Sequence, residues 1–477
     1  MEVRSIEFKQ RASERAIDGS LQGKLKTAKG LFVGGRARAV ARFDAEGGDF
    51  EALRDVGRGI RDEVLDNLDV WLETFEQNAT ARGATVLWAR DGAEISRLVV
   101  EIAQRHGVKK AIKSKSMLSE EAGLNEALEA VGVASIETDL GEYIIQLAKE
   151  PPSHIIAPAI HKNKEEVADL FEKHHHKPRK TEIGEMTREA REVLRSHFVS
   201  ADMGITGGNF LVAETGSVAL VTNEGNGRMV TTMPKVHVAV VGVEKVIPTL
   251  NDLAALLRLL PRSATGQTIS NYVSLLTGVK SEADRDGAEH LYYILVDNGR
   301  VGLVGSEFQE MLRCIRCGAC MNHCPVYQTI GGHAYGWVYP GPMGSVLTPL
   351  YTGLDKAPDL PHAATLCNQC GVVCPVKIPL PELLRKLREK QVQTGVGTAT
   401  AKAERRALKL WGFAARNPRL YAFGTRIATR YLKWLAGGKD RIQVLTMVPE
   451  WTKGRDFPAP EGKTFRELYA QRAARRR

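Results

Sequence analysis

The sequence predicts an α/β domain, followed by a small α-helical module rich in cysteine and by a basic, helical tail. Three observations lead to this prediction. Strand-like and helix-like segments alternate between about residues 84 and 173, all seven cysteines lie between residues 314 and 374, and the last segment is rich in Lys and Arg. We expect an N-terminal arm over residues 1–50, the α/β domain over 51–304, the cysteine module over 305–395 and the tail over 396–477.

The N-terminal arm is polar and basic, and its Gly-Gly pairs at 34–35 and 47–48 predict an extended or partly helical segment. From Phe50 to Asn78 the apolar residues recur at helical spacing, which predicts one long amphipathic helix.

The α/β domain is predicted from alternating elements. Four strands, at residues 84–89, 109–112, 134–138 and 154–157, are interleaved with helices at 94–104, 119–130, 143–148 and 164–173, with Ser119 as a helix cap. This alternation is typical of a parallel sheet covered by helices. Further along, we expect a pair of strands around residues 214–217, strands at 236–243 and 291–296, and a helix at 253–260.

The cysteines form a repeat with an offset of 50 residues. The first copy reads C-x2-C-x2-C-x3-C-P, and the second reads A-x2-C-x2-C-x3-C-P, with Ala364 in the place that Cys314 holds in the first. This double signature is typical of a module that binds two iron–sulfur clusters. The proline after each run ends the ligand loop, because proline has no N–H to donate and its φ is fixed.

In this signature the last cysteine of each run binds the other cluster. We therefore expect a complete [4Fe–4S] centre on Cys314, Cys317, Cys320 and Cys374. The second centre receives Cys324, Cys367 and Cys370, because Ala364 cannot bind iron. It is either [3Fe–4S], or [4Fe–4S] with one iron open or held by a ligand other than cysteine. Three histidines are candidates for that ligand: His323, His333 and His362.

Structural zinc and disulfides are the competing interpretations of the cysteines. Zinc suits two C-x2-C pairs with four ligands in all, which seven cysteines in this arrangement fit poorly. Disulfides need an oxidising compartment, and residues 1–21 are charged, with no apolar signal segment. No run of the sequence approaches the roughly 18 apolar residues of a membrane span, so we expect a cytoplasmic protein.

The basic charge is confined to the tail. Residues 401–477 contain 19 Lys and Arg against 6 Asp and Glu, a net charge of +13, so the rest of the chain carries −3 of the total of +10. Two interpretations stay open: helices that pack on the cysteine module or on a partner, and peripheral contact with a membrane surface through the interleaved aromatic residues. Nucleic acid is disfavoured, because the tail lacks a zinc-finger or RNA-recognition signature.

Other motifs allow both a structural and a functional interpretation. His174–His176 are predicted as a solvated loop, and Glu214 has no visible catalytic partner. Gly204, Gly207 and Gly208 suit turns, although their N–H groups could also face an anion. The run Lys113–Ser116 could bind a phosphate or carboxylate by charge, or be a solvated strand end. No catalytic residue is assigned.

Several segments resemble the lactate utilization protein B family. They include Lys115–Glu126, Glu137–Gln146, Pro152–Lys162, Ala201–Asn209, Glu214–Ser217, Asn223–Arg228, Arg262–Gln267 and the cysteine module. The resemblance implies a lactate-utilization domain of the NagB/RpiA/CoA-transferase-like α/β type, fused to a ferredoxin-type module. It also implies one subunit of a bacterial three-protein system that oxidises L-lactate to pyruvate, with a CCG-type cysteine-rich protein and a second lactate-utilization-domain protein as companions.

The functional hypothesis is that the chain relays electrons between a lactate-oxidising centre and an unidentified acceptor. Two alternatives stay open. The chain itself binds and activates a 2-hydroxy acid at an open cluster iron, or it is a non-redox binding protein whose clusters only hold the fold together.

Overall fold

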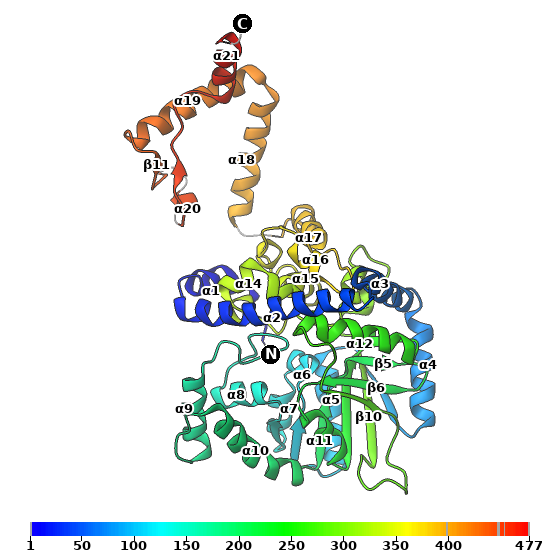
Figure 1. Cartoon of the computed structure of the whole chain (residues 1–477). Helices are drawn as coiled ribbons and strands as arrows, with labels where there is room; N and C mark the ends of the chain where they lie inside the picture. The colour runs from blue at the N-terminus through cyan, green and yellow to red at the C-terminus, as the bar shows by residue number, and fades with distance from the viewer. Residues whose placement is uncertain (1, 397–398, 446–448, 453, 476–477) are drawn as a thin grey trace. The chain divides into compact units, whose positions relative to one another are not determined.

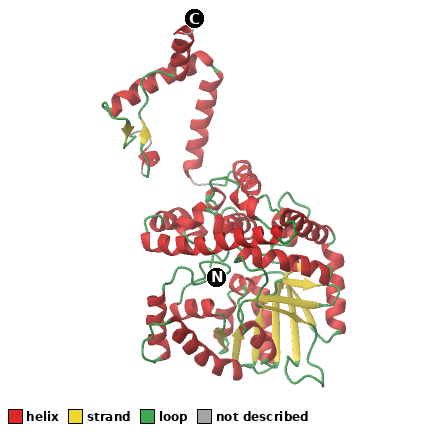
Figure 2. Cartoon of the chain, viewed as in Figure 1, coloured by secondary structure: helices red, strands yellow, loops and turns green. Residues whose placement is uncertain are grey.

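The computed structural model describes residues 2–396, 399–445, 449–452 and 454–475 (Figure 1). The chain forms two compact units, residues 1–396 and residues 397–477. The first unit contains a six-stranded sheet, a four-stranded sheet and the cysteine module, whereas helices make up most of the second unit (Figure 2).

The six-stranded sheet is parallel throughout, with the strand order β1-β10-β7-β4-β2-β3. Its strands are β1 (Thr85–Ala89), β2 (Lys110–Lys113), β3 (Ala134–Glu137), β4 (Met203–Thr206), β7 (Val236–Gly242) and β10 (His290–Val296). The central strand β7 is buried along its whole length, as a parallel sheet covered on both faces requires. The α/β class predicted from the alternating pattern is confirmed.

Helices and the second sheet cover the two faces. On one face, Ile95 and Val99 of α5 (Gly92–Arg105) and Leu128 of α7 (Leu124–Ala130) pack against strand residues such as Val238. On the other, Phe75 of α4 (Leu68–Ala81) packs among the strands of both sheets. Beside them, α8 (Leu140–Ala148), α9 (Lys164–His175) and α10 (Ile183–Val199) form a core cluster of their own.

The second sheet has the order β8-β5-β6-β9, with β5 (Phe210–Val212), β6 (Ser217–Thr222), β8 (Val246–Ile247) and β9 (Tyr272–Leu276). Strands β5 and β6 are the antiparallel pair expected around residues 214–217. Their turn packs tightly on α4: Gly216 has φ +64°, and a Cβ there would lie 2.3 Å from the backbone nitrogen of Ala79. Helix α12 (Leu250–Ala264), the predicted helix at 253–260, lies between this sheet and the cysteine module (Figure 1).

Two predicted helices are each divided in two. The helix expected over residues 50–78 is α3 (Phe50–Asp66) followed by α4, because Asn67 leaves the helical conformation at φ −133° and ψ 39°. The helix expected over 119–130 is α6 (Met117–Ala122) followed by α7, because Gly123 adopts φ +64°. The cap of α6 is Ser116 rather than Ser119.

The prediction of a strand at residues 154–157 is wrong. These residues form a turn in which Nδ1 of the buried His154 accepts hydrogen bonds from the backbone N–H groups of Ile156 and Ala157, at 3.1 and 3.3 Å. The His154 ring also bonds Asn322 of the cysteine module at 3.0 Å. The apolar run is therefore buried against another module, which local patterning cannot distinguish from burial in a sheet.

The N-terminal arm is helical, with α1 (Phe8–Arg15) and the 27-residue α2 (Gly19–Ala45), which packs on α12 and on the cysteine module. The cysteine module consists of short helices, η4 (Gln309–Arg313), α13 (Ala319–His323), α14 (Pro325–Ile330), η5 (His333–Tyr335), α15 (Gly341–Thr352), η6 (Leu360–His362), α16 (Gln369–Val373) and α17 (Leu380–Thr394). The segment ahead of Cys314 is the 3-10 turn η4.

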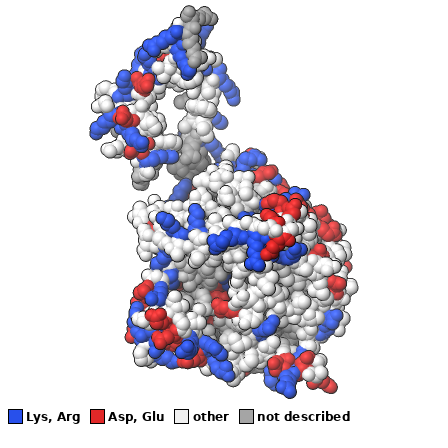
Figure 3. Space-filling view, in the orientation of Figure 1, with Lys and Arg blue, Asp and Glu red and all other residues white. Residues whose placement is uncertain are grey.

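The second unit contains helices α18 (Ala399–Arg416), α19 (Pro418–Ala436), α20 (Pro449–Thr452) and α21 (Phe465–Arg475), and the short strands β11 (Arg441–Ile442) and β12 (Phe457–Pro458). Lys and Arg outnumber Asp and Glu over its visible surface (Figure 3). None of the described helices combines the length and the apolar character needed to cross a membrane.

Candidate metal centre

The two cysteine runs fold as two copies of one backbone motif. Helices α13 and α16 begin 50 residues apart and pack on each other. The residues before them also correspond: Arg316 and Leu366 have φ +58° and +56°, and Gly318 and Asn368 have φ +75° and +64°. Left-handed conformations are uncommon outside glycine, so their recurrence at the same offset shows that the 50-residue alignment is structural. Ala364 is thus the structural counterpart of Cys314.

The seven cysteines line two separate pockets. The first cysteine pocket is lined by Cys314, Cys317, Cys320 and Cys374, together with apolar residues. The second cysteine pocket is lined by Cys324, Cys367 and Cys370, with Ala364 and Thr365 among its other walls. Each pocket thus takes its last cysteine from the other run, which is the grouping that the crosswise ligand assignment requires.

The donor chemistry of the pockets suits iron–sulfur clusters. The backbone N–H groups of Arg316 and Ile378 lie 3.4 Å from the sulfurs of Cys314 and Cys374, as N–H···S hydrogen bonds to cluster ligands require. Among the described residues, no three His, Cys, Asp or Glu side chains converge on a point where one metal ion could sit. A cluster spreads its ligands over several iron atoms, so its sulfurs stand around a pocket rather than around one ion.

Burial makes a bare thiolate costly in both pockets. It raises the pKa of the Cys374 thiol to about 11 and that of the Cys370 thiol to about 12, and it shifts Cys317 and Cys320 further upward. Cys367 is the exception: it is exposed, and a backbone hydrogen bond from Gln369 lowers its pKa. Buried thiolates need strong positive charge in the pocket, which iron supplies.

The second pocket has no fourth thiol. None of the three candidate histidines is among the residues that line it. His323 bonds the carbonyl of Ala319 at 2.9 Å, His333 that of Pro151 at 2.8 Å, and His362 the amide of Gln391 at 3.1 Å. At the position that corresponds to Cys314, the pocket is lined by the methyl group of Ala364, and the other described lining residues with polar side chains besides the cysteines are Thr365 and Gln369.

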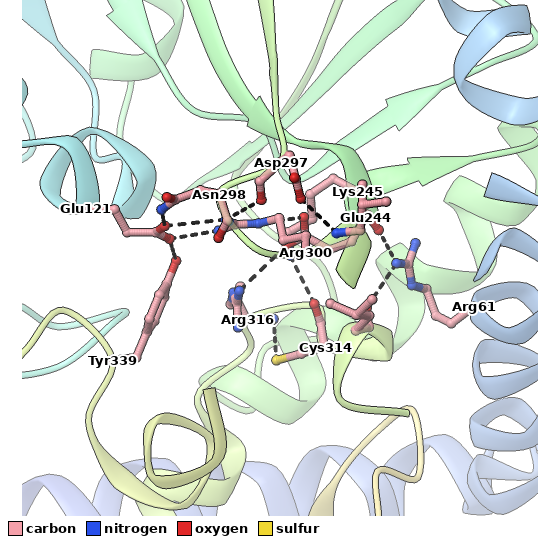
Figure 4. Close-up of polar contacts among 12 residues, drawn as sticks. Arg61, Glu121, Glu244, Lys245, Asp297, Asn298, Arg300, Cys314, Arg316 and Tyr339 are labelled. Carbon is pink, nitrogen blue, oxygen red and sulfur yellow. Dashed lines mark hydrogen bonds and ion pairs between the residues drawn. The ribbon is translucent and has the colours of Figure 1, made fainter. Parts of the chain in front are cut away.

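A buried polar network joins the parallel sheet to the first cysteine run (Figure 4). Immediately after β7, the Lys245 ammonium donates to the carbonyl of Cys314 at 3.0 Å. Its neighbour Glu244 lies 3.0 Å from the guanidinium of Arg300, which follows β10, and 3.6 Å from that of Arg316. Burial alone would raise the pKa of Glu244, but the surrounding cations, Arg300 first, hold it at about 2.

Further members of the network fix the neighbouring chain segments. Arg300 also pairs with Glu121 of α6 at 2.7 Å, and the Tyr339 hydroxyl donates to the same carboxylate. Arg61 of α3 donates to the carbonyls of Glu244, Val246 and Leu312, the last two at 2.9 and 3.1 Å. The sequence does not predict this network, because no short motif connects positions so far apart in the chain.

Three of the other candidates, Lys113, Glu214 and His175, have structural roles. Lys113 is fully buried and bonds Glu137 at 2.6 Å and Asn125 at 2.8 Å. The carboxylate of Glu214 accepts the backbone N–H of Leu250 at 2.9 Å, at the start of α12. The prediction of a solvated loop is wrong for His175, which ends α9 and bonds Glu189 at 2.8 Å with its side chain 1% exposed.

Three family models match the chain: a LUD domain over residues 72–296, a 4Fe-4S dicluster domain over 310–378, and the C-terminal region of lactate utilisation protein B over 383–474. Among similar proteins, "Lactate utilization protein B" of Bacillus subtilis is 42% identical over 478 residues, which cover 99% of this chain and 98% of that protein. The namesake from Bacillus licheniformis is 41% identical over 473 residues, with the same coverage.

"Uncharacterized electron transport protein YkgF" of Escherichia coli is 41% identical over 472 residues and 98% of both chains. A crystal structure of a DUF162 family protein from Deinococcus radiodurans aligns with 48% of this chain and 98% of its own, at 15% identity and a TM-score of 0.28. The resemblance inferred from the motifs, and the iron–sulfur character of the cysteine module, are confirmed by the near-full-length relatives and the dicluster domain.

Proposed function

Because this chain belongs to the lactate utilization protein B family, we propose that it is the electron-transfer subunit of a bacterial system that oxidises L-lactate to pyruvate. Two terms of the proposal, lactate utilization and electron transport, come from the names of the relatives. The observation that carries the proposal is the pair of cysteine pockets in one module, each completed by a cysteine of the other run.

The first pocket would hold a [4Fe–4S] cluster on Cys314, Cys317, Cys320 and Cys374. The second would hold a cluster on Cys324, Cys367 and Cys370, either [3Fe–4S] or [4Fe–4S] with an open iron. Such clusters supply one-electron transfer. Conversion of lactate to pyruvate releases two electrons and two protons, so two adjacent centres suit the passage of both electrons, one at a time, to a one-electron acceptor.

The protein's own residues hold the two centres in one rigid module and shield the first centre from water. Cys324 and Cys374 tie each run to the other's pocket, and helices α13 and α16 pack on each other. Apolar side chains such as Met311, Ile378 and Leu380 line the first pocket and exclude water. A rigid, water-poor surrounding limits reorganisation when the charge changes.

The exposure of the cysteines differs between the two pockets and favours one of them as the contact point for a redox partner. None of the described cysteines of the first pocket is exposed, whereas Cys367 of the second pocket is exposed, and so is its neighbour in the chain, Leu366. We infer that a redox partner meets the chain at the second pocket. Candidate partners are the CCG-type cysteine-rich subunit and the second lactate-utilization-domain protein.

A second candidate function rests on the corner occupied by Ala364. An iron without a thiolate there could bind and activate the oxygens of a 2-hydroxy acid. Low-temperature EPR separates the two: a signal of the second centre broadened by isotopically labelled lactate supports substrate binding at iron, and an unaffected signal supports relay alone.

The test of the relay is anaerobic co-purification of the chain with its partners, followed by iron analysis and EPR. We expect lactate to reduce the clusters in the assembled system and a one-electron acceptor to reoxidise them. Clusters that resist reduction by both lactate and dithionite would contradict the proposal and leave a purely structural role.

A further inference from the structure

A cavity of about 640 Å³ lies at the carboxyl ends of the parallel strands. Its walls include the loop after β2 (Ser114–Ser116), the loop after β4 (Gly207–Asn209) and the turn after β7 (Gly242–Lys245). Strand β3 lies on one side of β2, whereas β4, β7 and β10 follow on the other, so the order of the sheet reverses between β2 and β4. Parallel α/β sheets bind ligands at such a reversal, outside the carboxyl ends of the strands.

The same cavity borders the first cysteine pocket. Ile155, Ile315 and Arg316 line both spaces. Ile315 and Arg316 are the two residues between Cys314 and Cys317, so one layer of side chains separates the cavity from the predicted position of the complete cluster. The lining residues of the second cysteine pocket, in contrast, include none of those that line the cavity.

Lys115 supplies a cation that the protein leaves unpaired. Among the described residues, its ammonium takes part in none of the hydrogen bonds or ion pairs, although Lys113, two positions earlier, is paired with Glu137 at 2.6 Å. Burial lowers the pKa of Lys115, and the carboxylates of Asp139, Glu142 and Glu224 act in the opposite direction. The side chain is half-buried and lines the cavity, so an anion that enters would give this ammonium a direct partner.

The wall next to the first cysteine pocket is also positive. Lys245, Arg300 and Arg316 line it, and Glu244 pairs with the two arginines. The carboxylates Asp139 and Glu224 lie in the lining of the same cavity. Asn209, Asn223 and Gln267 add neutral hydrogen-bonding groups, and Ile144, Ile156 and Leu260 add apolar surface. Convergent cations with a few polar groups and apolar walls are typical of a site for a small organic anion.

We propose that this cavity is the binding site for the 2-hydroxy acid, with Lys115 as the partner of its carboxylate and its reacting carbon on the side of Ile315 and Arg316. The inference rests on the proposed function and places the substrate beside the complete cluster rather than at the open corner of the second one. The cavity is far larger than a three-carbon acid needs, so 2-hydroxy acids with longer side chains are expected to enter it as well.

The test measures binding, because binding does not require the partner proteins. Full-length chain with its clusters, prepared anaerobically, is titrated with L-lactate, with pyruvate and with the unreactive analogue oxamate in a calorimeter. We expect saturable binding at one site. Lys115→Met keeps the length of the side chain without its charge, and should weaken binding about tenfold or more, as expected for loss of a charge-assisted hydrogen bond. Lys115→Arg should retain most of the affinity.

The matched control is Lys110→Met, at the opposite end of β2, where the ammonium bonds only Ser200 at 2.8 Å among the described residues. It should leave the affinity unchanged. Iron content and thermal midpoint establish that each variant is folded and loaded. Equal affinity in Lys115→Met and wild type, or no saturable binding, would overturn the inference.

EPR of the dithionite-reduced protein gives a second readout. Pyruvate should perturb the signal of the first cluster and leave that of the second unchanged, whereas a perturbation confined to the second cluster would move the acid to the open iron and overturn the inference. Failure of the proposed function would give a different result. The wild-type protein would then lack clusters, or its clusters could not be reduced, even before a 2-hydroxy or 2-oxo acid is added.

Discussion

The guanidinium of Arg54, on helix α3, donates two hydrogen bonds to the main-chain carbonyl of Cys374, from Nε at 3.0 Å and from Nη2 at 2.8 Å. The same side chain pairs with Glu51 at 2.6 Å and is 7% exposed. A residue that precedes the parallel sheet therefore fixes the last cysteine of the second run, which lines the first pocket.

Replacing this arginine should loosen the first cluster site. In Arg54→Met the buried carbonyl of Cys374 loses its side-chain donors, which we expect to cost about 2 kcal/mol of stability. Thermal melting followed by visible absorbance should show earlier cluster loss than in wild type. Arg58→Met, on an exposed position of the same helix, is the control; equal midpoints for the two variants would contradict the role of Arg54.

Crosswise ligation predicts that each terminal cysteine serves the cluster of the other run. Cys374→Ala should abolish the cluster on Cys314, Cys317 and Cys320, while the cluster on Cys324, Cys367 and Cys370 assembles. Cys324→Ala should do the reverse. Mössbauer and EPR spectra of the two variants distinguish the centres, and an exchange of the two outcomes would mean that each run binds its cluster alone.

Restoring the missing thiol should complete the second centre. Because Ala364 lines the second pocket at the place of Cys314 in the repeat, Ala364→Cys is expected to convert that centre to a [4Fe–4S] cluster ligated entirely by cysteine. Iron content should not fall, and any [3Fe–4S] signal should disappear. Ala363→Cys, one position earlier and outside the pocket lining, should leave the spectrum as in wild type; an unchanged spectrum for Ala364→Cys would count against this placement.

The buried His237 predicts acid sensitivity. Its ring lies in β7 and bonds the hydroxyl of Thr206 at 3.0 Å, and burial lowers its pKa from 6.5 to about 3. The unfolded chain therefore binds a proton below pH 6.5 that the folded chain refuses until about pH 3, so stability falls as the pH is lowered through this window. For this one group the slope approaches about 1.4 kcal/mol per pH unit below pH 6.5 and averages about half of that between pH 7.5 and 5.5.

His237→Gln should remove the share of the slope that His237 contributes. The measurement is the dependence of the unfolding free energy on pH between about 7.5 and 5.5, where the histidines of the unfolded chain begin to titrate. His176→Asn, at an exposed position, is the comparison. A wild-type slope retained in His237→Gln would show that other groups dominate the acid response.

The sequence alone determined the features that depend on local order. The spacing of Cys314 to Cys324 and of Cys367 to Cys374 predicted both cysteine pockets and the place of Ala364, because short loops bring nearby cysteines together wherever the chain folds. The alternation of apolar runs predicted the parallel sheet for the same reason, since side-chain periodicity is a property of the local backbone.

Only the tertiary structure decided which distant residues surround those elements. Contacts between positions up to 320 residues apart decide that residues 154–157 form no strand and that helix 50–78 breaks. They also decide which carbonyls Arg54 and Lys245 bind, and they place the loop with Lys115 across one cavity from Ile315 and Arg316. Such contacts leave no spacing pattern in the chain, because they are selected by packing and by the need to pair buried polar groups rather than by the order of neighbouring residues.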